Sequence, residues 1–104
     1  MSTKQKVTQA FRELRKAGYF ARQNFWCCQT CGCAAVPDEY ADKYVFYHHQ
    51  DNRAWNKNGE LKYGLYLAWE GDAKFIVDTF RKQGLNAVHD GAEFTRILIL
   101  PKEE

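Results

Sequence analysis

The chain has 104 residues, a formal net charge of +2 and four cysteines. Its length is that of one domain whose core is large enough to fold unaided. The charge is too small to indicate a nucleic-acid partner, and no apolar run is long enough to span a membrane. The first residues lack an apolar signal segment, which predicts a cytoplasmic protein with reduced thiols.

Residues 2–17 are predicted to form a helix, because apolar residues recur there at helical spacing. Ser2 or Thr3 is expected to cap its start, and Gly18 stands where a left-handed residue ends a helix. The apolar stripe consists of Val7, Ala10, Phe11, Leu14 and Ala17.

The opposite face of this helix is basic. It carries Lys4, Lys6, Arg12, Arg15 and Lys16 against a single acid, Glu13. A solvated surface is the common explanation of such a face, and a docking face for a partner is the alternative. In the second interpretation Arg12, Arg15, Lys16 and Arg22 are the predicted partner-binding residues.

The next segment, residues 19–28, is predicted to be a strand, with Ala21, Phe25 and Cys27 on one face. Residues 29–43 are predicted to be mostly loop, with a short helix beginning at Pro37. Residues 44–49, rich in aromatic and β-branched side chains, are predicted to form a second strand.

A polar connection over residues 50–63 contains an Asn58-Gly59 turn signal. A third strand is predicted at residues 64–69, with Leu65, Leu67 and Trp69 on one face. Asp72 is expected to cap a second long helix that ends at Gly84. Residues 85–89 and 94–100 are predicted to form a hairpin, and the second of these strands, the most apolar, is expected to lie centrally.

The elements follow the order α-β-β-β-α-β-β, without an evident internal repeat. This order predicts an α+β fold: one mainly antiparallel sheet of about five strands, with the two long helices packed on one face. We expect residues 1–104 to form a single domain.

All four cysteines lie between residues 27 and 33. The spacing Cys28-x-x-Cys31-Gly32 resembles half of a zinc knuckle, and Cys33 with His48 or His49 is expected to complete the ligand set, His89 being a weaker candidate. A second interpretation is a redox pair of Cys28 and Cys31. A third is structural, with Cys27 buried in the core.

Two further constellations allow alternative functions. His48 and Asp51 close the second strand, so that a Cys-His or His-Asp pair is an enzymatic alternative; a hydrogen-bonded strand end is the commoner explanation. The aromatic residues also suggest a stacking platform for bases, with Arg22 and Arg53 as phosphate contacts. The platform would consist of Tyr44, Phe46, Tyr47, Tyr63, Tyr66 and Trp69. There is no glycine-rich phosphate loop and no HExxH motif.

Four segments together resemble a family of uncharacterised bacterial and prophage proteins: residues 21–25, the Cys27-Cys28-x-x-Cys31-Gly32 segment, the strand ending in His48-x-Gln50-Asp51, and residues 64–67. The resemblance implies an intracellular α+β domain. It implies no activity, substrate or catalytic residue, and Cys33 falls outside the shared pattern.

The resulting hypothesis is a small non-enzymatic binding or regulatory protein. It would act through contact with another protein, as an accessory protein or a phage-type inhibitor, with a structural zinc at the cysteine cluster as an additional expectation. The alternatives are a thiol-redox or Cys/His-dependent enzyme and a nucleic-acid-binding module.

Overall fold

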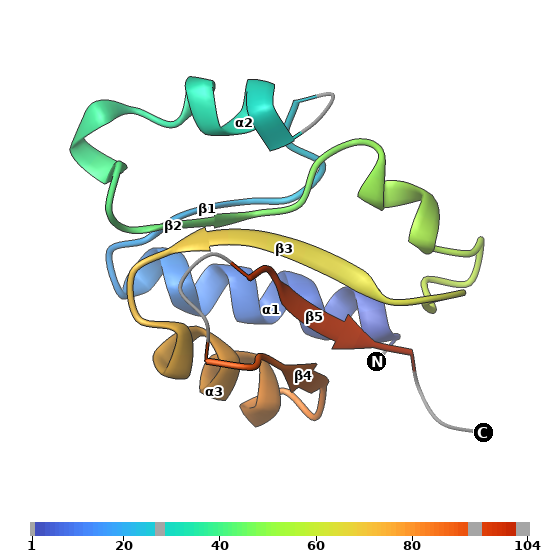
Figure 1. Ribbon diagram of the computed structural model, residues 1–104. Helices are drawn as coiled ribbons and strands as arrows, with labels where there is room; N and C mark the ends of the chain where they lie inside the picture. Colours follow the sequence, from blue (N-terminus) through green and yellow to red (C-terminus); the bar gives the residue numbers. More distant parts are fainter. Residues whose placement is uncertain (1, 27–28, 92–94, 102–104) are drawn as a thin grey trace.

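Five strands form one mixed sheet, with two long helices on one face and a short helix over part of the other (Figure 1). The computed structural model describes residues 2–26, 29–91 and 95–101. The helices are α1 (Thr3–Lys16), α2 (Gln29–Ala35) and α3 (Ala73–Lys82), with 3-10 turns η1 (Asp38–Tyr40) and η2 (Asp51–Ala54). The strands are β1 (Phe20–Arg22), β2 (Tyr44–Phe46), β3 (Leu65–Glu70), β4 (Asn86–Val88) and β5 (Ile97–Leu100). The predicted α+β class is confirmed.

The strand order is β1-β2-β3-β5-β4, and all neighbours are antiparallel except β1 and β2, which run parallel. Residues 23–43 therefore form a crossover that carries α2 over the sheet, as a parallel pair requires. β5 lies between β3 and β4, so the prediction that this most apolar strand is central is confirmed. Its partner β4 and the first strand β1 occupy the two edges.

The first helix forms as predicted, and its start is stabilised by reciprocal capping. The Ser2 hydroxyl accepts a hydrogen bond from the Gln5 N–H, and the Gln5 side chain accepts one from the Ser2 N–H, which together satisfy two otherwise orphaned donors. The buried stripe is Thr3, Val7, Ala10, Phe11 and Leu14. Ala17 is exposed, so its predicted place in the stripe is wrong, because the helix ends one residue earlier.

The predicted strand over residues 19–28 is much shorter in the structure. Asn24 and Trp26 have φ angles of 52° and 63°, a left-handed conformation that interrupts the side-chain alternation of a strand. Phe25 consequently leaves the face of Ala21 and packs against Phe20, with 5.3 Å between ring centroids. The predicted burial of Cys27 lies outside the described residues. The second strand is also shorter than expected, since β2 ends at Phe46.

Helix α2 replaces the first part of the loop predicted over residues 29–43 and contains Cys31 and Cys33. Gly32 lies inside this helix and is buried. A Cβ atom at this position would come within 2.6 Å of Cε1 of Phe46. Glycine is therefore required for the close packing of α2 on β2, and this contact offsets the low helix propensity of the residue.

Two apolar clusters hold the layers together. The larger lies between the sheet and the pair α1 and α3, where the Phe11 and Phe80 rings meet edge to face at 5.6 Å. The smaller lies under α2 and contains Val36, Phe46 and Ala68, with Phe20 and Phe25 packed against it. Both long helices thus cover one face, as predicted, and α2 covers only the β1 and β2 side of the other (Figure 1).

A helix-to-strand unit occurs twice, although the sequence was expected to hold no repeat. Arg15, Lys16, Gly18 and Ala21 of the first unit (residues 11–22) recur at one constant offset as Arg81, Lys82, Gly84 and Ala87 of the second unit (residues 77–88). In each unit the glycine has a positive φ, 94° and 84°. In each, the arginine side chain donates a 3.0 Å hydrogen bond to the alanine carbonyl of an edge strand.

The ends of the two helices also match in their backbone bonds. The N–H of Tyr19 bonds the Leu14 carbonyl at 3.0 Å, and the N–H of Leu85 bonds the Phe80 carbonyl at 3.3 Å. These are the six-to-one bonds of a Schellman motif, which needs the left-handed glycine. The two units run in opposite directions, since β1 is antiparallel to β3 while β4 is parallel to it.

Candidate functional site

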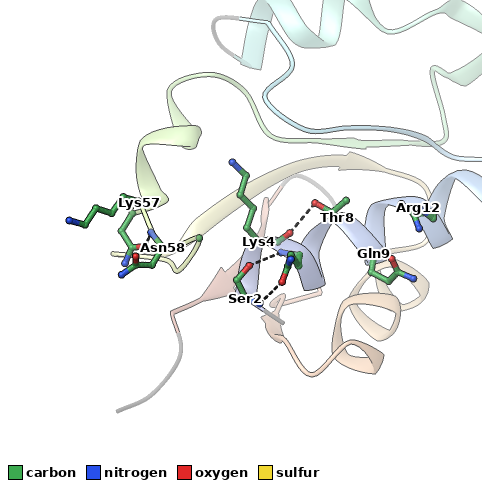
Figure 2. Close-up of a pocket in the computed structure, with 10 residues that line it drawn as sticks. Ser2, Lys4, Thr8, Gln9, Arg12, Lys57 and Asn58 are labelled. Carbon is green, nitrogen blue, oxygen red and sulfur yellow. Dashed lines mark hydrogen bonds between the residues drawn. The ribbon is translucent and has the colours of Figure 1, made fainter.

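An open groove runs between the outer face of α1 and the loop over residues 56–59. Its volume is about 620 Å³. Figure 2 shows the α1 residues following one another along the helix, with Lys57 and Asn58 on the loop beside the first turn. Among the described residues the lining holds three cations, Lys4, Arg12 and Lys57, and no carboxylate. The rest of the lining is polar: Ser2, Gln5, Thr8, Gln9, Asn56, Asn58 and Gly59.

The backbone donors at the start of α1 are already occupied. The Thr3 N–H and hydroxyl both donate to the Glu60 carboxylate, and the Lys4 N–H donates to the Gly59 carbonyl at 2.9 Å. Glu60 thus sits where the positive end of the helix dipole favours a carboxylate. Any anion in the groove would meet side-chain cations and amides rather than the helix terminus.

The predicted partner-binding residues lie at the other end of the same helix. Arg12, Arg15, Lys16 and Arg22 are all exposed. Arg15 and Arg22 each donate a 3.0 Å bond to the Ala21 carbonyl, so two guanidinium groups meet at the edge of the sheet. Among the described residues, of these four only Lys16 forms an ion pair, with Glu13 at 3.4 Å. The structure therefore brings Arg15 and Arg22 together, and Arg12 links them along α1 to the groove.

Comparison of the two units shows which cations recur at corresponding positions and which do not. Arg15 and Lys16 recur as Arg81 and Lys82, and both pairs lie in the last turn of a helix, where cations interact favourably with the helix dipole. The positions that correspond to Arg12 and Arg22 hold Asp78 and Val88. The positive charge at Arg12 and Arg22 is therefore not needed to build such a unit.

The cysteine segment is described only in part, because Cys28 lies outside the described residues. Cys31 is exposed, and Cys33 is half-buried with its Sγ 3.7 Å from the Tyr44 hydroxyl. Two causes raise the pKa of Tyr44 above its ordinary range: burial, which is the larger, and this contact with Cys33. Within the described ranges no three histidine, cysteine, aspartate or glutamate side chains gather to hold a metal ion. The zinc set of Cys28, Cys31, Cys33 and His48 stays a prediction, as does the redox pair.

His48 is buried and tied to its own turn. Its Nε2 lies 3.1 Å from Oδ2 of Asp51, and its Nδ1 accepts a 3.3 Å bond from the Asp51 N–H. Because Nδ1 is an acceptor, Nε2 carries the proton and donates to the carboxylate. Zinc binding at His48 would require Asp51 to give up one of these contacts, and the same applies to a nucleophile that uses His48 as a base.

Asp51 is the acidic partner of this histidine. Burial raises the pKa of the Asp51 carboxyl, and the neighbouring His48 and Arg96, whose Nη1 lies 3.9 Å away, oppose that increase. The arrangement is that of a closed turn rather than an open catalytic pair. It agrees with the hydrogen-bonded strand end that the sequence also allowed.

The other two histidines are engaged in similar local contacts. His49 is exposed, with Nδ1 3.1 Å from Oδ1 of Asn24. His89 accepts the Gly91 N–H at Nδ1, as His48 accepts that of Asp51, and its Nε2 donates to the Thr95 carbonyl at 2.9 Å. In this geometry His89 has no ring nitrogen left for a metal ion.

The aromatic residues do not form the single platform that base stacking would need. Phe46 and Tyr47 are 0% and 1% exposed and belong to the two core clusters. Tyr63 and Tyr66 are exposed, whereas Tyr44 and Trp69 are half-buried. The platform prediction is therefore wrong, because alternating residues of β2 enter opposite apolar layers.

Comparison with known proteins gives a family but no activity. The family model described as Domain of unknown function (DUF6891) matches residues 2–103. The chain belongs to this family. The searches of curated proteins and of solved structures found no match. Membership agrees with the expected resemblance to an uncharacterised family. Among the described residues, no helix is long and apolar enough to cross a membrane.

The groove was missed at the sequence level. Lys4 and Arg12 belong to the predicted basic face, but for Asn56 and Lys57 the sequence predicts only a polar connection, with a turn at Asn58-Gly59. The helical spacing of Lys4, Thr8 and Arg12 indicates one shared face, yet nothing local indicates that the 56–59 loop folds back onto it. That juxtaposition depends on the contact of the Gly59 carbonyl with the helix start.

Proposed function

We propose that this protein is a small non-enzymatic binding protein that acts by contact with another protein through the basic surface of α1 and β1. The observation that carries the proposal is the pair Arg12 and Arg22. Both are exposed and form no ion pair among the described residues, and the repeated unit is built without cations at the corresponding positions. Exposed charges without an ionic partner in their own chain are typical of surfaces that select a partner.

The proposal includes the finer expectations from the sequence. The protein is an accessory or inhibitory factor of bacterial or phage origin that works in the cytoplasm. The engagement of His48 with Asp51 supports a binding role over a Cys/His-dependent reaction, since both ring nitrogens already contact Asp51.

A comparative capture experiment tests the proposal. Immobilised wild-type protein and the variant Arg12→Glu/Arg22→Glu are exposed to lysate of the native host, and the bound proteins are identified by mass spectrometry. The matched control is Lys62→Glu/Lys74→Glu, which makes the same change of charge at two exposed lysines outside α1 and β1. We expect one protein to be retained by the wild type and the control and lost from the Arg12→Glu/Arg22→Glu variant. Equal retention by all three proteins, or no retained protein, would contradict the proposal.

A further inference from the structure

The groove beside α1 has the chemistry of a site for an acidic polypeptide. We infer that it binds an extended acidic segment of the partner protein, which lies along α1 from the 56–59 loop towards Arg12 and Arg22. This inference rests on the proposed function and adds the place and the chemical class of what is bound.

Charge is the first argument. Lys4, Arg12 and Lys57 line the groove without a carboxylate among the described lining residues. The nearest acid on the loop, Glu60, is bound to the start of the helix through Thr3. The field in the groove is therefore positive, and an acidic segment matches it.

The spacing of the cations is the second argument. Lys4 and Arg12 are two turns apart on α1, or about 12 Å at 1.5 Å per residue. A single small anion cannot meet both Lys4 and Arg12 at this separation, whereas Lys57 lies on the loop beside the Lys4 end. An extended chain advances about 3.3 Å per residue, and about four residues span the distance with carboxylates near each end.

The polar lining is the third argument. Gln5, Gln9, Asn56 and Asn58 add four amide side chains to the groove, and amides both donate to and accept from a peptide backbone. The amide oxygens of Gln5 and Asn56 already accept N–H groups of the chain, so these two side chains offer their NH₂ groups as donors. Figure 2 shows Gln9 on α1 and Asn58 on the loop. No aromatic side chain lines the groove among the described residues. Single-stranded nucleic acid sites depend on aromatic stacking, so the lining favours a polypeptide over a nucleic acid.

The experiment measures binding of defined probes to the full-length protein by fluorescence anisotropy. The first probe is a labelled peptide of about eight residues that alternates glutamate with serine, long enough to pass the groove at 3.3 Å per residue. The second carries lysine in place of glutamate. The third is a short oligothymidylate with the same number of negative charges as the first. We expect the acidic peptide to bind more tightly than either other probe and to weaken as salt is raised.

Variants locate the site. Lys57→Glu and Arg12→Glu should each weaken acidic-peptide binding by about three- to tenfold, as expected for reversing one screened surface charge. Lys74→Glu, an equal change on α3, should alter it by less than about twofold. Circular dichroism of every variant checks that the fold is retained, and Lys57, on an exposed loop, is the position least able to disturb it.

Three outcomes would overturn the inference. These are equal weakening by Lys74→Glu and Lys57→Glu, tighter binding of the oligothymidylate than of the acidic peptide, and no measurable binding of the acidic peptide. The capture experiment with Arg12→Glu/Arg22→Glu is independent of these probes. A partner that is still captured while the peptide fails to bind would refute the groove and leave the proposed function standing.

Discussion

The two helix-to-strand units of this protein share their internal contacts and differ in their outer surfaces. Each has an arginine near the helix end, a left-handed glycine and a fully buried alanine on an edge strand. The helix of the first unit, α1, carries the basic groove along its earlier turns, beside the 56–59 loop, and Arg12 is the one lining residue that belongs to the unit itself. The hollow beside α3 in the second unit includes the carboxylate of Asp78 in its lining, together with lysine and arginine.

This difference separates the charges that the fold depends on from those that it does not need. Arg15 and Arg81 bond the outward carbonyls of Ala21 and Ala87, groups that would otherwise be open for another strand to pair with. Their recurrence is explained by edge protection and by the helix dipole. Arg12 and Arg22 have no cationic counterpart in the second unit, although Arg22 also donates to the Ala21 carbonyl. The proposed partner surface rests on this difference.

The largest expected loss of unfolding free energy comes from replacing the residues near the helix ends that face the shared core. Leu14 and Phe80 occupy corresponding positions and are both 0% exposed. Leu14→Ala and Phe80→Ala should each lower the free energy of unfolding by about 3–5 kcal/mol, because each leaves a cavity. Urea denaturation followed by circular dichroism measures both. A loss below about 1 kcal/mol in one of them would show that the two units are not equivalent in the core.

A pH experiment tests a buried contact that lies beside the first unit and joins α1 to the segments after β1 and β2. The Tyr47 hydroxyl donates to Gln23, whose amide in turn donates to Thr8 of α1. Burial raises the pKa of Tyr47 to about 12, so between the ordinary tyrosine value near 10 and this value the folded chain keeps a proton that the unfolded chain has lost. The unfolding free energy should therefore fall as pH rises through this window, by about 1–3 kcal/mol.

The variant Tyr47→Phe provides the control. It lacks the ionisable hydroxyl, so its unfolding free energy should fall less than that of the wild type between pH 10 and pH 12. Denaturation curves at the two pH values give the comparison. An equal fall in both proteins would assign the alkaline loss to other groups and remove the argument for a buried Tyr47–Gln23 contact.

Smaller effects are expected from the two left-handed glycines. Gly18→Ala and Gly84→Ala should each lower the unfolding free energy by about 1–2 kcal/mol, because a Cβ disfavours positive φ. The Gly18 variant should lose slightly more, since its Cβ would lie 3.3 Å from Lys43 Nζ, whereas at Gly84 the nearest atom is Lys6 Nζ at 3.7 Å. Asparagine at the same positions should cost less, as it tolerates this conformation. Equal costs for alanine and asparagine would contradict the explanation by backbone conformation.

Loss of the edge contacts should have a still smaller effect on stability. Arg15→Ala and Arg81→Ala each remove one hydrogen bond to an edge carbonyl, which is worth about 0.5–1.5 kcal/mol. Arg81→Ala should also associate more readily, because the Ala87 carbonyl becomes open to pairing. Arg15→Ala should do so less, because the Ala21 carbonyl still accepts a hydrogen bond from Arg22. Chemical denaturation and analytical ultracentrifugation measure the two effects. Arg12→Ala is the control, and association of that variant to the same degree would argue against a specific role of the arginines at the edges.

Much of the fold follows from local patterns in the sequence. The apolar stripe and caps of α1 and α3 and the alternation in β3 predict elements close to those observed. The errors come from tertiary contacts. Position 32 of helix α2 is a glycine because any side chain there would collide with the Phe46 ring. The early end of β1 follows from the positive φ of Asn24, which the residue type alone does not determine.

The site was less predictable than the fold. A basic helix face is visible in the sequence, but the groove exists only because the 56–59 loop returns to the start of α1 through Gly59 and Glu60. The His48 motif was visible too, and its chemistry depends on a contact with Asp51 three residues later. The spacing of residues in the sequence predicts neither the return of the 56–59 loop to α1 nor the contact of His48 with Asp51, since both depend on how the surrounding segments pack.

The smallest change in stability is expected for Arg12 and Arg22, the residues whose replacement should weaken partner binding most. Arg12→Glu and Arg22→Glu alter exposed side chains, and surface changes of this kind usually shift the unfolding free energy by within about 0.5 kcal/mol. Arg22 also lies over the Phe20 ring, with Cζ 4.6 Å from the centroid, so Arg22→Glu should cost slightly more than Arg12→Glu. Thermal and urea denaturation of the two variants give these values. If either variant lost stability comparable to Leu14→Ala, the residue would belong to the architecture that both units share, and the charge difference between the units would no longer indicate a binding surface.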